Sequence, residues 1–242
     1  MQDPRFMSST QAQAANIDAG LRAYMLGVYN HMTIGMAITG FFAYLTKIMS
    51  VTSEGMLTPF GAAIYTSPLK WLVMLAPLGM VFWLSAKVQT MKPETARNLF
   101  YAFAAIMGIS LSSLLLVFTG ESVIRVFFLT AASFSALSIY GYTTKKNLTS
   151  LGSFLIMGLV GLILASIVNI FLASSAMQFI ISVVGVLIFA GLTAYDTQRI
   201  KLMYMASDDR GTALKKSIMG ALTLYLDFIN MFIMLLQLLG NR

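Results

Sequence analysis

Two aspartates, Asp196 and Asp227, lie within long apolar stretches of the chain. An ionisable side chain inside a membrane costs about 2.5–3.5 kcal/mol on insertion scales, so each such residue is a functional candidate by default. Asp227 lies in the apolar run 222–239 and has no basic residue within a helical turn or two. It therefore needs a partner on another helix, a water-filled cavity or a proton.

Both aspartates also have simpler explanations. Arg199 follows Asp196 by three residues, which is the spacing of a pair on one helix face. Asp196 is then either an interfacial residue paired with Arg199 or a partner for Asp227. For Asp227, the simpler alternative is a structural hydrogen-bond acceptor.

The connection between the two aspartate-bearing stretches is short, so the two helices should be antiparallel neighbours. Counting residues from Arg199 and from Lys216 places Asp227 deeper than Asp196 by about 12 Å, at 1.5 Å per residue. The two carboxyl groups can meet only if the last helix begins nearer Gly220, or if either helix tilts. The spacing permits the pairing without establishing it.

A meeting of the two carboxylates would have a specific consequence. Two carboxylates close together in a low dielectric cannot both ionise comfortably, so the pair shares a proton and responds to pH. When it is deprotonated, the pair attracts a cation. Two carboxylates supply only part of the six to eight oxygens that calcium prefers, so Asp196 and Asp227 would bind calcium transiently, as a gate rather than a store.

Three further residues could support such a pair. His31 in the first apolar stretch could tune a pH response, or it could be a packed structural histidine. Lys87 ends the second stretch, where it either extends its charge to the membrane surface or acts as a counter-ion for one aspartate. Asn230 is one turn from Asp227 and could stabilise it, although such residues usually hydrogen-bond between helices.

The composition excludes several classes of function. Hydrophobic residues make up 58% of the chain and charged residues only 10%, against about 25% in soluble domains. There is no cysteine and one histidine, so disulfides, thiolate chemistry and multi-histidine zinc sites are excluded. No phosphate-binding GxxxxGK[ST] loop is present. We therefore expect a membrane protein that is not an enzyme and has no cofactor, apart from a transient calcium ion.

The apolar stretches predict an all-α integral membrane protein with seven transmembrane helices. Each stretch has close to the 20 residues or so that cross about 30 Å of hydrocarbon. Residues 1–20 are polar and lack the apolar core of a signal peptide, so we expect a polar cytoplasmic segment there and a single transmembrane domain over 21–242. The predicted spans are 22–46, 71–87, 97–118, 122–142, 151–172, 177–199 and 217–239.

The basic residues set the expected orientation. With the N-terminus in the cytoplasm, twelve basic residues fall on inside segments and four on outside segments, a clear positive-inside bias. The C-terminus is then outside, and the net charge of +7 reflects the inner loops rather than a nucleic-acid partner. The inside set is Arg5, Arg22, Lys87, Lys92, Arg97, Lys145, Lys146, Arg199, Lys201, Arg210, Lys215 and Lys216, and the outside set is Lys47, Lys70, Arg125 and Arg242.

The segments around the two aspartates resemble the signature of the Bax inhibitor-1 (transmembrane Bax inhibitor motif) family. They read AYDTQRIK over 194–201 and LTLYLDFINMF over 222–232. The resemblance extends to LSAK over 84–87, MGISLS over 107–112 and SIVNIF over 166–171. The length and the polar N-terminus are most similar to the members found in bacterial inner membranes.

The resemblance implies a fold in which six helices surround the last one, and a pH-sensitive calcium leak gated by a di-aspartyl sensor. By motif match the sensor residues are Asp196 and Asp227. Similar members of the family have an arginine late in the second span, which exchanges partners with the sensor on opening. This sequence has Lys87 there, a point charge without the forked geometry of arginine. The implied location is the bacterial inner (plasma) membrane, and the implied partners are the lipid bilayer, calcium and protons.

Two other functions remain open from the sequence. The resemblance also suggests a non-transporting regulator of a membrane-bound ATP-dependent protease, or another stress-response partner. Its natural determinants would be the polar segment 1–20 and the basic inner loops. A weaker alternative is proton-coupled transport of a small solute, which would make pH changes depend on the substrate.

Overall fold

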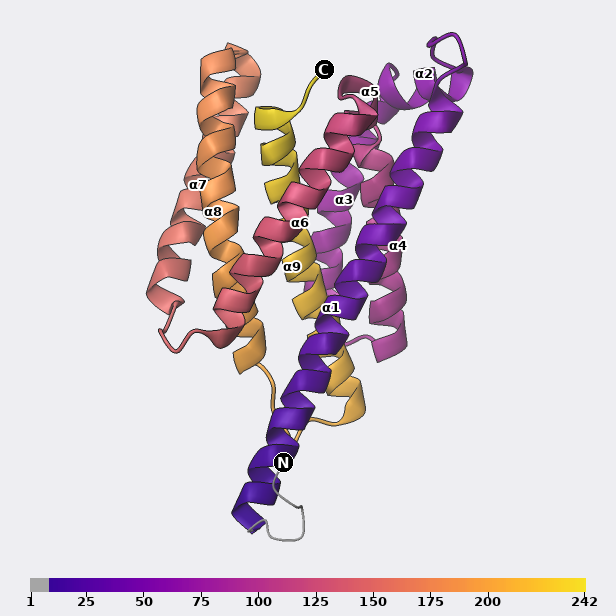
Figure 1. Ribbon diagram of the computed structural model, residues 1–242. Helices are drawn as coiled ribbons and strands as arrows, with labels where there is room; N and C mark the ends of the chain where they lie inside the picture. The colour runs from indigo at the N-terminus through magenta and orange to yellow at the C-terminus, as the bar shows by residue number, and fades with distance from the viewer. Residues whose placement is uncertain (1–8) are drawn as a thin grey trace.

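In the computed structural model, the chain is an elongated bundle of helices that run back and forth along one axis (Figure 1). The structure describes residues 9–242, with side chains from Ile17 onward apart from Asp18. The described part contains no strand beyond one isolated bridge. The helices are α1 (Ser9–Ser50), α2 (Pro59–Tyr65), α3 (Leu69–Lys87), α4 (Pro93–Leu111), α5 (Leu114–Val117), α6 (Gly120–Thr143), α7 (Thr149–Leu172), α8 (Ser175–Leu202) and α9 (Arg210–Leu239).

Seven of the described segments are long and apolar enough to cross a membrane, which confirms the predicted number of spans. They occupy positions close to those expected, although most are longer by several residues. The largest difference is at the last span, which the structure begins seven residues earlier than predicted. The seven are Ala19–Ser50, Leu69–Lys87, Pro93–Val117, Gly120–Thr143, Thr149–Leu172, Ser175–Leu202 and Arg210–Leu239.

The tight turn between α7 and α8 separates two apolar helices without a single charged residue. Ala173 ends α7 in the left-handed conformation, with φ of 48°. A residue in this conformation ends a helix, because the backbone leaves the right-handed path. The conformation carries some cost for a residue other than glycine. Ser174 then begins α8 by accepting a hydrogen bond from the backbone N–H of Met177 (3.3 Å). At the other end of the bundle, Asp209 begins α9 in the same way.

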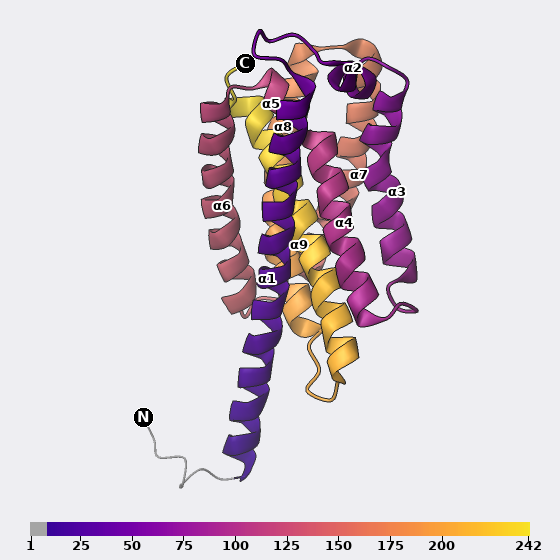
Figure 2. The ribbon, with the colours of Figure 1, turned by 90° about the vertical axis from the view of Figure 1, so that its right-hand side faces the viewer.

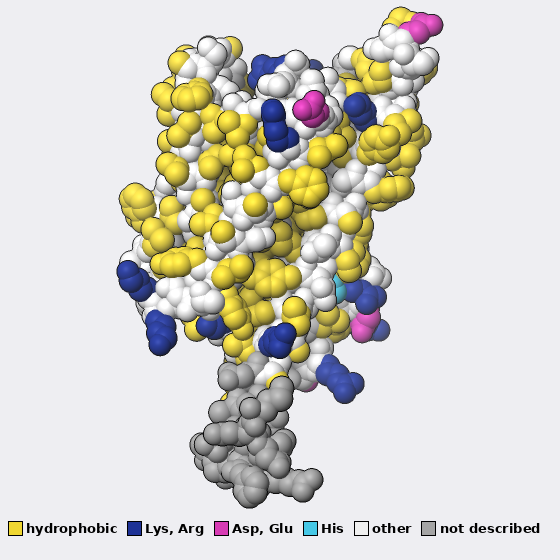
Figure 3. All heavy atoms as spheres, in the orientation of Figure 1, with side chains coloured by type: hydrophobic (Ala, Val, Ile, Leu, Met, Phe, Trp, Pro, Cys, Tyr) yellow, Lys and Arg dark blue, Asp and Glu magenta, His cyan; other side chains and the backbone are white. Residues whose placement is uncertain are grey.

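The two ends of the bundle differ in charge. The α3–α4, α6–α7 and α8–α9 connections lie at the end where the N-terminus lies, and the C-terminus lies at the opposite end (Figures 1 and 2). Hydrophobic side chains cover the middle of the visible face, and lysines and arginines gather toward its ends (Figure 3). Apart from Arg5, which lies outside the described residues, the basic residues assigned to the inside fall at the N-terminal end, which we call the basic end.

Helix α9 packs mainly against four of the other spans rather than the six that the resemblance implies. It packs against α1, α4, α6 and α8, and it has the largest buried share of any span. Helix α3 packs mainly against α4, and α7 mainly against α8, so these two lie in outer positions. The small helix α2 packs on α1 and α3, and its Tyr65 hydroxyl bonds to Ser112 Oγ (2.7 Å) over the end of α4.

Tyr225 holds α9 to two neighbours at once. Its ring packs edge-on against Phe100 (5.8 Å between centroids) and Phe103 (5.7 Å) of α4. Its hydroxyl lies 2.6 Å from Thr39 Oγ1 of α1. Thr39 donates its own proton to the carbonyl oxygen of Ala104 (2.9 Å), so the tyrosine donates to the threonine. Every polar atom in this buried contact is satisfied, which fixes α1, α4 and α9 relative to one another.

Helices α6 and α8 cross at a glycine. A methyl group placed on Gly141 would overlap the backbone of Ala194. Membrane helices gain stability from such close backbone approach, because lipid supplies no hydrophobic drive for their association. Gly161 on α7, by contrast, faces open space.

We predict that Gly141→Ala destabilises the protein, whereas Gly161→Ala does not. Forcing extra volume into a packed contact costs about 1–3 kcal/mol. Replacing glycine by alanine raises helix propensity equally at both positions, by up to about 1 kcal/mol. The difference in stability between the two variants therefore reports the packing at the α6–α8 crossing. Thermal unfolding in detergent measures it. Equal melting temperatures for the two variants would contradict the close α6–α8 contact.

The charge asymmetry predicts that the basic end faces the cytoplasm. Because the chain has no cysteine, single cysteines report the topology without background. Glu54→Cys, in the loop at the far end, should react with a membrane-impermeant maleimide in intact cells, and Asn147→Cys should react only after the membrane is opened. The reverse pattern would show that the C-terminus is cytoplasmic.

Candidate functional site: a buried pair of aspartates

The packing of α8 against α9 brings Asp196 and Asp227 together. Their carboxyl groups lie within hydrogen-bonding reach of each other. Both are buried, with exposures of 8% for Asp196 and 5% for Asp227. Of the two interpretations that the spacing left open, the structure has the arrangement in which the acids face each other.

The register of the two helices explains how the acids meet despite the depth difference counted from the sequence. A methyl group on Gly220 of α9 would press on the side chain of Ile200 of α8, so these two residues lie at the same level. Asp227 is seven residues from Gly220, and Asp196 is four from Ile200. The remaining offset is therefore about 4.5 Å at 1.5 Å per residue. The count from Arg199 and Lys216 was wrong because α9 extends past the level at which α8 ends.

The direction of the side chains closes much of this offset. In an α-helix each Cα–Cβ bond tilts toward the N-terminus of the helix. Helix α8 runs toward the basic end, so Asp196 tilts away from that end. Helix α9 runs in the opposite direction, so Asp227 tilts toward it. The two carboxyl groups therefore lean toward each other.

Two carboxylates offer only acceptor atoms, so a hydrogen bond between them needs a proton. Oδ2 of Asp227 is fully buried, and no N–H or O–H group of the described residues donates to it. A proton held by the pair supplies the missing donor and removes one of two adjacent buried charges. The arrangement is thus suited to hold one proton between two acids.

The hydroxyl of Thr197, the residue after Asp196, bonds to groups other than the acids. Thr197 donates to the carbonyl oxygen of Thr193 (2.7 Å), and its Oγ1 lies 2.9 Å from Ser138 Oγ of α6. Ser138 in turn lies 2.7 Å from the Tyr29 hydroxyl of α1. Since the Thr197 proton is used, the order of donation runs from Tyr29 to Ser138 to Thr197. This hydroxyl chain joins three helices beside the acids and leaves them to pair with each other.

The residues expected to support the pair take other positions. Arg199 is exposed and, within residues 9–242, forms no salt bridge with Asp196. Lys87 is exposed at the end of α3, and none of its described contacts reaches either acid. Asn230 donates to the carbonyl oxygen of Leu226 on its own helix (2.8 Å). In this conformation the two aspartates have no basic side chain as a direct partner among the described residues.

His31 lies elsewhere in the bundle. Its Nδ1 is 2.8 Å from the Tyr101 hydroxyl, so it links α1 to α4. The ring is partly buried, with Tyr101 tilted against it. This is the packed, hydrogen-bonded arrangement of a structural histidine.

A second polar cluster lies near the end opposite the basic end and was not predicted as a unit. Gln178 of α8 donates to Gln237 of α9, and Ser182 also donates to Gln237 (3.1 Å). Asn169 of α7 donates to Gln178 (3.3 Å). The sequence signal for it was several amides inside apolar spans, which identifies hydrogen-bonding residues without identifying their partners.

The acid pair can supply only part of a metal site. Among the described residues, no group of three or more His, Asp or Glu side chains converges on one point. Calcium takes six to eight oxygen ligands, so backbone oxygens or water would have to complete its shell. Two carboxylates fit brief binding of a hard cation better than tight retention.

Comparisons with known proteins cover almost the whole chain. A family model described as inhibitor of apoptosis-promoting Bax1 matches residues 21–242. An uncharacterized protein of Rickettsia prowazekii is 43% identical over 97% of this chain and 96% of its own length. An uncharacterized protein of Caulobacter vibrioides is 46% identical over 94% of this chain and 92% of its own. Inner membrane protein YbhL of Escherichia coli is 42% identical over 93% and 94%.

We predict that the acid pair carries a proton at neutral pH. The infrared spectrum of the protein in lipid should then contain the C=O stretch of a protonated carboxylic acid. The band should disappear in Asp227→Asn. The amide N–H of Asn can donate the hydrogen bond to Asp196, so the pair no longer needs a protonated carboxylic acid. Glu121→Gln, which alters an exposed acid at the start of α6, should leave the band unchanged. Absence of the band in the unaltered protein would contradict the shared proton.

Proposed function

The chain belongs to the Bax inhibitor-1 family, and on that basis we propose that it is a pH-sensitive calcium leak channel gated by Asp196 and Asp227. The cation moves passively down its gradient, and the protonation state of the acid pair sets the rate. The observation that carries the proposal is a pair of buried carboxyl groups that face each other without a salt bridge to a basic side chain among the described residues.

The electrostatics of the pair supports a link between proton and cation. With one proton bound, the pair carries a single negative charge and its hydrogen bond holds α8 to α9. Loss of the proton leaves two negative charges in a low dielectric, where they repel each other and attract a cation. A divalent ion with a preference for oxygen ligands compensates both charges, which favours calcium.

The surroundings of the pair support a closed gate in the conformation described. Toward the basic end, α9 buries Ile218 and Leu222. Toward the far end it buries Ile229 and Leu236. Packed apolar side chains on both sides of the pair oppose the entry of water and ions. Opening therefore requires α9 and its neighbours to separate, and repulsion between two ionised acids is a force in that direction.

We place the protein in the inner membrane of a bacterium. The support is the inner membrane location stated for YbhL of Escherichia coli, together with the seven apolar spans of this chain. The basic end faces the cytoplasm in this proposal. Calcium that enters from outside then meets the acid pair from the far end of the bundle.

Flux measurements in liposomes test the proposal. The purified protein in vesicles that contain a calcium-sensitive dye should admit calcium, and the rate should rise with pH as the shared proton is lost. Asp227→Asn and Asp196→Asn should each lower the rate about tenfold, equivalent to about 1.4 kcal/mol on the barrier, and should abolish its pH dependence. Glu121→Gln is the matched control, since it removes an acid far from the pair and should change neither property.

Two results would contradict this function. Vesicles with the unaltered protein could admit calcium no faster than empty vesicles. Alternatively, both Asn variants could keep the full rate and its pH dependence, in which case the acids are structural.

The alternative role as a regulator of a membrane-bound protease has one structural support. Helix α1 continues beyond its membrane span toward the basic end, so its first turns project from the bundle (Figure 2). A regulator that acts through this segment should lose its effect on the protease when residues 1–20 are deleted, while calcium flux is kept. The Asn variants of the acid pair should show the opposite pattern, with calcium flux lost and the effect on the protease kept.

A further inference from the structure

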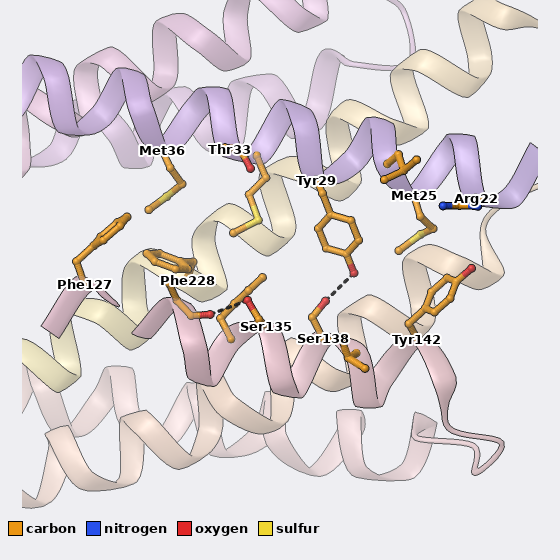
Figure 4. A pocket seen from close by; sticks show the side chains of 15 residues that line it. Arg22, Met25, Tyr29, Thr33, Met36, Phe127, Ser135, Ser138, Tyr142 and Phe228 are labelled. Carbon is orange, nitrogen blue, oxygen red and sulfur yellow. Dashed lines mark hydrogen bonds between the residues drawn. The ribbon is translucent and has the colours of Figure 1, made fainter. Parts of the chain in front are cut away.

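A cavity of about 680 Å³ lies between α1 and α6. Met25, Tyr29 and Met36 line it from the α1 side, and Phe127 and Ser138 from the α6 side (Figure 4). Phe228 of α9 also lines it, between these two walls. We call this cavity the α1–α6 groove.

The groove faces the region that lipid occupies. Leu26 and Thr33 on the α1 wall are exposed, as are Ser135 and Ile139 on the α6 wall. Exposure at the middle of a transmembrane span means contact with hydrocarbon. A lipid molecule can therefore enter the groove sideways without passing through water.

Three hydroxyl groups of the groove donate their protons within the protein. Tyr29 donates to Ser138, and Ser138 donates to Thr197 behind the wall (2.7 and 2.9 Å). Ser135 donates to the carbonyl oxygen of Ala131 on its own helix (2.7 Å). With these protons used internally, the wall presents mainly carbon and sulfur to an occupant. This lining suits an acyl chain.

The charge of the groove is confined to one end. Arg22 is the one charged residue among those that line it, and none of them is acidic. Tyr142 lies at the same end, with Lys201 Nζ 4.9 Å from its ring centroid and bonded to its carbonyl oxygen (2.8 Å). A guanidinium suits a phosphate group because it offers several N–H donors in one plane. The groove thus has an apolar length and a positive mouth.

The dimensions agree with this chemistry. From Arg22 to Met36 the α1 wall is about 21 Å long at 1.5 Å per residue, about two-thirds of the roughly 30 Å hydrocarbon thickness. The volume lies within the roughly 300–1,000 Å³ typical of ligand pockets. A single acyl chain with its headgroup at the membrane surface matches this length and volume.

We propose that the α1–α6 groove is a binding site for one anionic phospholipid of the leaflet at the basic end. One acyl chain lies along the groove against Phe228, and the phosphate binds Arg22. This binding does not depend on ion transport, so it can be tested whether or not the protein conducts calcium.

Thermal unfolding in detergent with added lipid tests the proposal. Dioleoylphosphatidylglycerol should raise the melting temperature of the delipidated protein more than dioleoylphosphatidylcholine does. Arg22→Gln should reduce the apparent affinity for the anionic lipid about fivefold, because a basic residue near an anionic headgroup contributes about 1 kcal/mol. Lys92→Gln removes a charge at the same end outside the groove and should change nothing.

Filling the groove with a bulky side chain tests whether an acyl chain binds there. Ala131→Trp places an indole in the groove and should abolish stabilisation by both lipids, whereas Ala132→Trp, exposed on the same helix and absent from the lining, should not. Phosphatidylglycerol with a photoreactive acyl chain, applied to the unaltered protein, should label α1 and α6 at the groove. This second measurement applies even if Ala131→Trp does not fold.

Three outcomes would overturn the proposal. Arg22→Gln and Lys92→Gln could weaken the effect of the anionic lipid equally, which would indicate a general surface charge effect. The photoreactive lipid could label all membrane-facing helices alike. A stable dimer that Ala131→Trp dissociates would show that a second copy of the chain occupies the groove.

Discussion

The free-energy cost of burying two carboxyl groups side by side is the constraint on which the proposed mechanism depends. Neither Asp196 nor Asp227 has a basic side chain as a direct partner among the described residues, and Oδ2 of Asp227 has no other donor there. A shared proton meets both needs, because it lowers the charge and supplies the hydrogen bond. The contact between α8 and α9 is then tied to the protonation state of the pair, which makes the central helix contact sensitive to pH.

The rest of the bundle holds this contact in place. Tyr225, two residues before Asp227, fixes α9 to α1 and α4 through Thr39 and two phenylalanines. The hydroxyl chain from Tyr29 ends at Thr197, the neighbour of Asp196. The α1–α6 groove is lined by Phe228, the neighbour of Asp227. A lipid in the groove would therefore contact the residue next to Asp227 on α9.

The seven spans could be predicted from the sequence because an apolar run of about 20 residues has few alternatives in a membrane protein. The meeting of the acids could not, because it depends on the register of α8 and α9. The depth of Asp227 was counted from Lys216, whereas the contact of Gly220 with Ile200 sets the register of α9 against α8. The hydroxyl chain and the second polar cluster, around Gln178 and Gln237, were missed for a related reason. Hydrogen-bonding capacity is visible in a sequence, whereas the choice of partner is a property of packing.

The proposed proton-sensitive gate is tested most directly by the separation of the Asp196 and Asp227 carboxyl groups in structures determined in lipid at two pH values. At the lower pH the two groups should lie within hydrogen-bonding distance, with α8 and α9 in contact as described here. At a pH where the proton is lost, they should move apart or hold a cation between them. A separation beyond hydrogen-bonding or water-bridged reach at both values would contradict the shared proton and, with it, the gate.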